Sequence, residues 1–131
     1  MIGIVIVAHG GLAREYLAAV EHVVGKLERV RTISIEGDFD RAEKEAEIRA
    51  AAEEVDEGEG VVVVTDMFGG SPCNLSFCCA QGPTNRRFLH GANLPMLIKL
   101  AKSRGRPIDE AASSALDAGR KYIDCINKKT G

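Results

Sequence analysis

Two short apolar runs without polar–apolar alternation constrain the fold more than any other feature of the sequence. Ile2–Ala8 is mostly β-branched, and Val61–Thr65 begins with four consecutive valines. A strand with one solvent-facing side would alternate, so both runs are typical of strands buried on both faces, as in a parallel sheet covered by helices. Val30–Ile35 and Arg86–Gly91 are expected to add two further strands.

Segments with helical spacing of apolar residues follow these strands. Helices are expected over residues 12–27, 40–57, 94–104 and 108–127, and Ser71-Pro72 suits the cap and first position of another. The expected apolar faces comprise Leu12, Tyr16, Val20, Val23, Val24 and Leu27 in the first helix, Ile48, Ala51, Ala52 and Val55 in the second, and Ala112, Ala115, Gly119, Tyr122, Ile123 and Ile126 in the last. The order predicts an α/β fold: a doubly wound, mostly parallel sheet of about four strands with helices on both faces.

Composition narrows the classes of protein to which the chain can belong. With 17 Lys and Arg against 19 Asp and Glu, the net charge is −2, which lacks the basic excess of a nucleic-acid binder. The longest apolar run falls far short of the roughly 20 residues of a membrane span, and no basic segment precedes it as in a signal peptide. Four cysteines without a CxxC spacing are expected to be reduced thiols, and no metal site is expected. A single cytoplasmic domain over residues 1–131 is therefore expected.

Reactive side chains stand where the predicted strands end. His9 follows the first strand and Asp66 the third, and in doubly wound sheets ligands collect beyond the carboxyl ends of the strands. If these strands are neighbours, the carboxylate can accept one ring N–H of the histidine and leave the other nitrogen free as a nucleophile. Gly69, Gly70 and Ser71 lead into a predicted helix, whose first backbone N–H groups favour an anion. Together these residues indicate a phosphoryl group carried on nitrogen.

Each of these features also has a simpler structural explanation. A histidine after a buried strand is often structural, an aspartate can cap a loop, and two glycines before Ser-Pro can merely start a helix. Neither a P-loop nor the Gly-x-Gly-x-x-Gly spacing of a dinucleotide-binding turn occurs. The combination at two strand ends is what favours a functional cleft. His90, at the fourth strand end, is expected to be packed or solvated, and His22 to lie on the surface.

Three segments carry a family resemblance: Ile4–Gly10, Thr65–Asn74 and Gly91–Met96. The second contains the motif Asp-x-(Phe/Trp)-Gly-Gly-(Ser/Thr)-Pro-x-Asn, paired with the upstream His-Gly of the first. In order and separation these segments resemble the mannose-family enzyme IIA domain of the bacterial phosphotransferase system, over nearly the whole chain.

The resemblance implies a role for each matching residue. His9 would accept a phosphoryl group from phosphorylated HPr, and Asp66 would hydrogen-bond and orient its imidazole. Ser71 would line the phosphate pocket, with Gly69 and Gly70 allowing close backbone approach. No metal or organic cofactor is implied.

The resemblance also implies partners. The acceptor would be a histidine of a separate enzyme IIB protein, the family forms homodimers, and any contact with a membrane permease would run through partners. Small and apolar residues around the cleft would recognise donor and acceptor: Met67, Phe68, Leu94 and Met96. Simple loop packing explains each of these four equally well.

Three alternatives remain open at this point. The chain could be a regulatory module whose phosphorylation state controls a partner without a transporter. It could be the phosphotransferase subunit serving dihydroxyacetone kinase, although that subunit's second loop resembles Asp-x-Gly-Ser-Ala, unlike Asp66–Pro72 here. It could also be a non-catalytic anion or nucleotide binder on a flavodoxin-like sheet, which would bind without forming a phosphohistidine.

Overall fold

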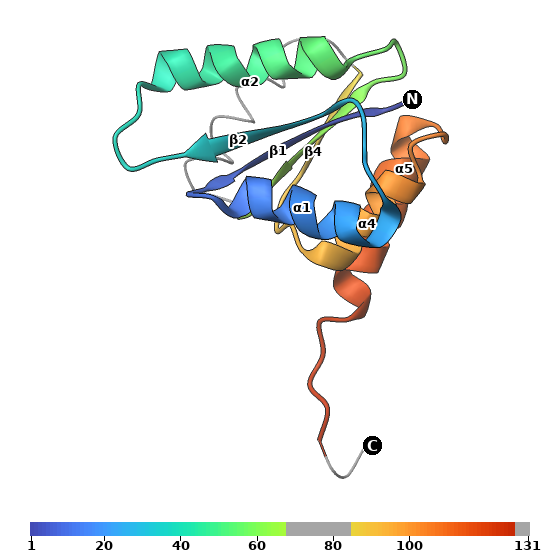
Figure 1. The fold of residues 1–131 in the computed structure, drawn as a ribbon. Coiled ribbons are helices and arrows are strands. Elements are labelled where there is room, and N and C mark those ends of the chain that lie inside the picture. Colours follow the sequence, from blue (N-terminus) through green and yellow to red (C-terminus); the bar gives the residue numbers. More distant parts are fainter. Residues whose placement is uncertain (68–84, 128–131) are drawn as a thin grey trace.

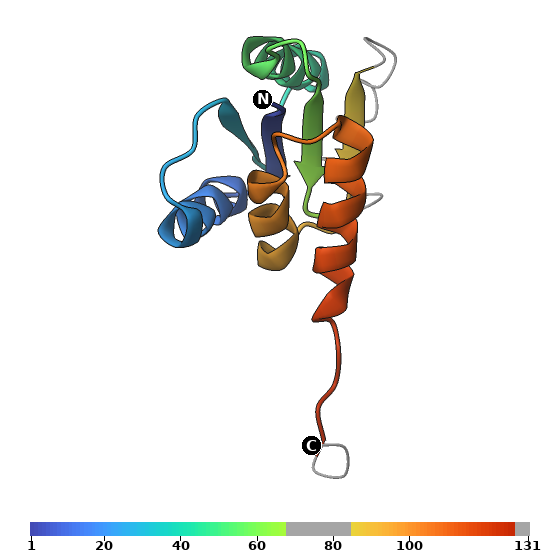
Figure 2. The same ribbon diagram turned by 90° about the vertical axis from the view of Figure 1, so that its right-hand side faces the viewer.

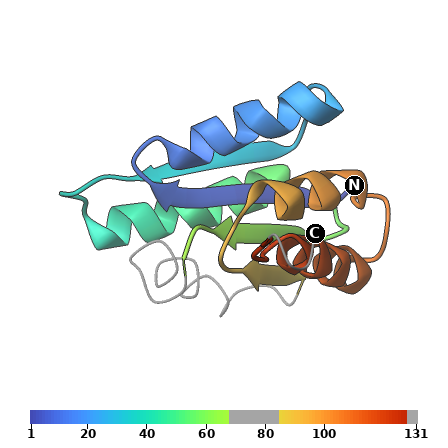
Figure 3. The same cartoon turned by 90° about the horizontal axis from the view of Figure 1, so that it is seen from below.

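A computed structural model describes residues 1–67 and 85–127 and contains a four-stranded sheet in the order β2-β1-β3-β4. The strands are β1 (Gly3–His9), β2 (Val30–Ile35), β3 (Val61–Thr65) and β4 (Arg86–Leu89). Every pair of neighbours is parallel, and the strand arrows point in one direction (Figure 3). The expected parallel α/β sheet is confirmed.

Helices cover both faces of this sheet, as predicted (Figures 1 and 2). The helices α1 (Leu12–Val24), α4 (Leu94–Lys102) and α5 (Ile108–Lys121) pack on one face, and α2 (Arg41–Val55) packs on the other. The predicted stripe of α2 is buried, and the side chain of Asp40 caps that helix by accepting a hydrogen bond from the Glu43 N–H at 3.0 Å.

The two faces explain why the central strands lack alternation. Val62 and Val64 pack into the core beneath α1, α4 and α5, whereas Val61 and Val63 pack beneath α2. Every residue of β3 is fully buried. Because neither face of the strand meets water, apolar residues are favoured at every position.

The strand order reverses direction between β1 and β3. The chain passes from β1 through α1 to β2 on one side, and then from β2 through α2 to β3 on the other side of β1. Such a switch point is where doubly wound sheets bind ligands, outside the carboxyl ends of the strands. His9 and Asp66 lie at this position, because Val7 on β1 is in register with Thr65 on β3.

Several predicted elements end earlier in the structure than expected, including the second helix, which ends at Val55 rather than at residue 57. The first helix ends at Val24 rather than at residue 27, and the Leu27 N–H donates instead to the side chain of Glu21 at 2.9 Å. The fourth strand ends at Leu89 rather than at Gly91, and the fourth helix ends at Lys102 rather than at residue 104.

The prediction for the end of the last helix is wrong. This helix ends at Lys121, and Tyr122, Ile123 and Ile126 are exposed rather than part of its apolar face. The segment from 122 to 127 extends away from the body of the molecule (Figures 1 and 2). Helical turns without tertiary packing are only marginally stable in water. The helix ends here because the residues after Lys121 do not pack against the sheet.

Candidate active site

His9 ends β1 with its side chain 48% exposed, so the imidazole is accessible from solvent. The chain turns immediately afterwards at Gly10, whose φ of +55° lies in the left-handed region that favours glycine. The Gly10 N–H donates to the Ile35 carbonyl at 3.0 Å and so anchors the turn to the end of β2. Strand end and turn together fix the backbone from which the imidazole projects.

Asp66 directly follows β3, and its side chain is only 10% exposed. Its Oδ2 accepts a hydrogen bond from the His9 backbone N–H at 3.1 Å and lies 2.9 Å from the ring Nδ1. An ionised carboxylate can only accept hydrogen bonds, so Nδ1 must carry the proton in this pair. The Nε2 of a neutral imidazole then carries the lone pair, which is the state needed for nucleophilic attack.

The second oxygen of Asp66 has a different environment. Oδ1 is buried and has no hydrogen-bond partner within residues 1–67 and 85–127. Among the described residues, Oδ2 is therefore the Asp66 oxygen that makes the contacts with His9.

A second pair at the same edge was not anticipated from the sequence. The hydroxyl of Thr65, which is fully buried, lies 3.1 Å from Nδ1 of His90. Burial lowers the pKa of His90 and thus favours its neutral form. Thr65 is the last residue of β3 and is in register with Val7 of β1, so this pair connects the end of β4 to the strand that positions Asp66.

The remaining predicted site residues differ in their exposure to solvent. Met67 is exposed and Leu94 is partly buried, whereas Met96 is buried in the core. Phe68, Gly69, Gly70 and Ser71 lie outside the described residues. Cys125 is a free, exposed thiol, and no group of three or more metal-binding side chains occurs within the described part of the chain.

Tyr16 is a residue whose position sequence reasoning did not exploit. The sequence predicts this residue on the apolar face of the first helix, and its ring packs against the core. Its hydroxyl donates to the Ala92 carbonyl at 3.0 Å, between α1 and the loop that follows β4. The available signal was a hydroxyl on an otherwise apolar helix face one turn beyond the His9 loop.

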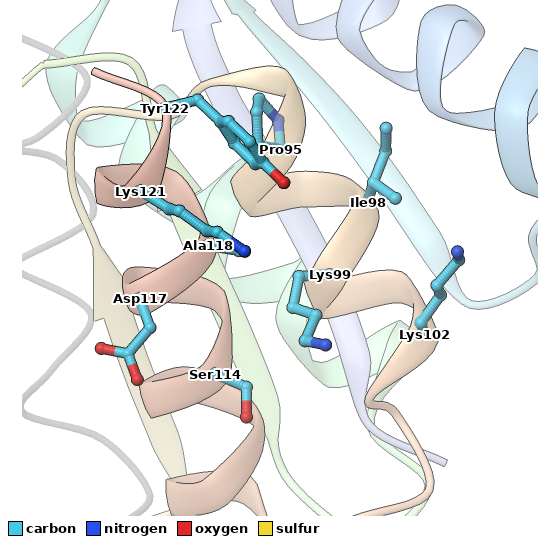
Figure 4. Close-up of a pocket in the computed structure, with 9 residues that line it drawn as sticks. All are labelled: Pro95, Ile98, Lys99, Lys102, Ser114, Asp117, Ala118, Lys121 and Tyr122. Atoms are coloured by element: carbon cyan, nitrogen blue, oxygen red, sulfur yellow. The ribbon is translucent and has the colours of Figure 1, made fainter. Parts of the chain in front are cut away.

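A groove of about 550 Å³ lies between α4 and α5 (Figure 4). Its lining comprises Pro95, Ile98, Lys99, Lys102, Ser114, Asp117, Ala118, Lys121 and Tyr122. Neither His9 nor Asp66 contributes to it. We therefore assign the candidate chemistry to the strand ends, where the nucleophile and its carboxylate partner meet, and not to this groove.

Comparison with known proteins shows the family of the chain. Residues 3–116 match the family profile EIIA-man, described as the PTS system fructose IIA component. The PTS system mannose-specific EIIAB component of Escherichia coli K12 is 27% identical over 130 residues, which cover 98% of this chain and 40% of that protein. The chain thus spans less than half the length of the curated relatives that it matches first.

Solved structures are similar over almost the full length. The mannose/sorbose specific IIA subunit of the phosphotransferase system from Enterococcus faecalis has a TM-score of 0.86 and 26% identity, covering 96% of this chain and 95% of that one. The phosphotransferase system component EIIA from Streptococcus agalactiae has a TM-score of 0.81 and 26% identity, covering both chains fully. With the profile matched across most of its length, the chain belongs to the EIIA-man family of phosphotransferase-system IIA components.

Proposed function

We propose that this protein is a phosphocarrier that accepts a phosphoryl group from phosphorylated HPr on His9 and passes it to a histidine of an enzyme IIB partner during carbohydrate uptake. The observation that carries this proposal is the pairing of His9 with Asp66 at the switch point of the sheet. An exposed imidazole with one nitrogen anchored and the other free suits a group that must receive and then release a phosphoryl group.

The chemistry needs only the two histidines and the phosphoryl group between them. Nε2 of His9 attacks the phosphorus, the N–P bond of phosphorylated HPr breaks, and an N–P bond to His9 forms. The ring then carries a positive charge shared with Nδ1–H, which the nearby Asp66 carboxylate offsets. In the second transfer the N–P bond of His9 breaks as a new one forms on enzyme IIB, and His9 returns to its neutral state.

Three residues outside the described ranges complete the proposed site. Gly69 and Gly70 would bring backbone N–H groups to the phosphoryl oxygens, and the Ser71 hydroxyl would donate a further hydrogen bond. These contacts would stabilise the phosphorylated form only modestly, as a carrier that must pass the group onward requires. No metal or organic cofactor takes part in the proposed transfer.

The proposed partners follow from the family resemblance. Met67, Phe68 and Leu94 are our candidates for contact with HPr and enzyme IIB. Met96, the fourth candidate from the sequence, is buried in the core. We also propose a homodimer, for which the exposed Tyr122, Ile123 and Ile126 offer apolar surface. None of the described helices is long and apolar enough to span a membrane, and we expect the protein to act in the cytoplasm.

Phosphorylation by phosphoenolpyruvate, enzyme I and HPr tests the proposal. The wild-type protein should acquire an acid-labile, base-stable phosphoryl label that His9→Ala abolishes. His22→Ala is the matched control, because that histidine is exposed on α1, and it should label normally. An unlabelled wild type with active HPr would refute the carrier function and favour a non-catalytic anion binder.

The acceptor distinguishes uptake from regulation. Adding enzyme IIB to the labelled protein should transfer the label to that partner. If the label stays on His9 with every enzyme IIB tested, the transport role fails, and a regulatory module signalling by its phosphorylation state becomes the better description.

A further inference from the structure

Tyr16 connects α1 to a loop at the edge of the candidate site. Its ring is partly buried, and its hydroxyl donates to the carbonyl of Ala92, 76 residues further along the chain, at 3.0 Å. Burial, and then the negative charge of Asp66, raise the pKa of this phenol above its ordinary value. Tyr16 is therefore a protonated donor, and its hydroxyl lies within the electrostatic field of Asp66.

A backbone hydrogen bond connects Ala92 in turn to the residue that precedes Asp66. The Ala92 N–H donates to the Thr65 carbonyl at 2.9 Å, and Ala92 and Thr65 are both buried. Thr65 immediately precedes Asp66, which in turn accepts both hydrogen bonds from His9. The chain runs from His9 through the Gly10 turn into the helix that carries Tyr16. The hydrogen bonds and the covalent backbone together therefore form a closed loop that contains both His9 and Tyr16.

The far side of the same loop is held independently. The Asn93 side chain accepts a hydrogen bond from the Met96 N–H at 3.0 Å, capping α4, and donates to the Gly119 carbonyl at 2.8 Å. Asn93 thus fixes the loop to α4 and α5, but neither of those helices carries His9 or Asp66. Tyr16 supplies a side-chain hydrogen bond that joins this loop to the helix after His9.

We propose that Tyr16 is a positioning residue for phosphoryl transfer at His9, an inference that rests on the proposed function. Its hydroxyl fixes the start of α1 relative to the Ala92–Thr65 backbone. This hydrogen bond holds His9 at its observed distance from Asp66. At that distance the proton stays on Nδ1, and Nε2 is left unprotonated. Tyr16 touches neither the phosphoryl group nor the imidazole in this role.

The test compares Tyr16→Phe with Ser113→Ala. The first variant keeps the packed ring and removes only the donor to Ala92. The second removes an exposed hydroxyl group on α5. Labelling of His9 from phosphorylated HPr should slow about three- to tenfold in Tyr16→Phe, which corresponds to the loss of one neutral hydrogen bond. Ser113→Ala should label at the wild-type rate.

A second measurement separates positioning from a general loss of stability. Nitrogen NMR of the unphosphorylated imidazole should show His9 mainly in its Nδ1–H form in wild type, and a larger share of the Nε2–H form in Tyr16→Phe. A fold-stabilising hydrogen bond alone would leave this ratio unchanged while the protein remains folded.

The outcomes are distinct. Wild-type labelling rate together with the wild-type tautomer ratio in Tyr16→Phe overturns the role of Tyr16 and leaves the phosphocarrier function standing. Slower labelling with an unchanged tautomer ratio also overturns the positioning role. A wild type that is never labelled overturns the proposed function and the role of Tyr16 with it.

Discussion

A single carboxylate oxygen of Asp66 restrains both the backbone and the ring of His9. Oδ2 lies 3.1 Å from the His9 backbone nitrogen and 2.9 Å from Nδ1. Two bonds to one acceptor fix the imidazole relative to its own strand, so that Nε2 is directed away from Asp66. The nucleophile is thereby oriented before any partner arrives, which lowers the entropic cost of reaching the transition state.

Asp66→Asn should slow phosphorylation of His9 by about 10- to 100-fold, the range expected for losing a hydrogen bond to a charged group. The amide can still accept a hydrogen bond, but it does not offset the positive charge of the phosphorylated ring. Initial rates of labelling by phosphorylated HPr measure the effect. Asp117→Asn, an exposed change on α5, should leave the rate unaltered.

Gly3→Ala should destabilise the fold by about 1–3 kcal/mol, as overpacking of a tight core does. A methyl group at Gly3 would meet the carbonyl oxygen and Cγ2 of Val55, where α2 crosses the start of β1. Gly37→Ala is the control, because that position has open space. Equal urea midpoints for the two variants would contradict the close contact between α2 and β1.

Asp56→Asn should cost on the order of 3 kcal/mol, because it leaves a buried arginine without its counter-charge. Oδ2 of Asp56 lies 2.8 Å from Nη1 of Arg86, and the two side chains are 19% and 6% exposed, respectively. Asp109→Asn breaks the more exposed pair with Arg87, and should change stability little. Urea midpoints of the two variants at neutral pH provide the comparison.

The Asp56 pair also predicts a dependence on pH. The Gly58 N–H, and with it Arg86 and Asn85, lower the pKa of Asp56, so the folded protein binds this proton more weakly than the unfolded chain. Its contribution is therefore present at neutral pH and is lost as the pH falls below the ordinary carboxyl value of about 3.9. Asp56→Asn should lose less stability than wild type over that acidic range; an identical loss would contradict the assignment.

His90 predicts a second, milder dependence. Burial lowers its pKa, so the unfolded chain takes up this proton more readily than the folded protein. Stability should fall as the pH drops below about 6.5, the ordinary value for histidine. His90→Asn retains a hydrogen-bonding group near Thr65, and its stability should fall less steeply with decreasing pH. His22→Asn, a change on the surface, should follow the wild-type profile. Parallel pH profiles for wild type and His90→Asn would contradict this.

The central sheet and the two principal residues were predictable because their signals are local. Uninterrupted β-branched runs such as Val61–Thr65 report burial on both faces, and His9 and Asp66 stand directly after two of them. The end of the last helix was not predictable in the same way. The apolar spacing of Ile123 and Ile126 suits a helix, but no described element provides a face for them to pack against.

The sequence by itself determined the alternation of strands and helices, the burial of the strands, and the placing of a histidine and an aspartate at two strand ends. Only the tertiary structure decided that β1 and β3 are neighbours, and with it the contact between His9 and Asp66 across 57 residues. It likewise decided that the Tyr16 hydroxyl meets Ala92 across 76 residues. Local propensity and periodicity fix what each segment becomes, whereas long-range contacts depend on strand order and on which helix packs against which face.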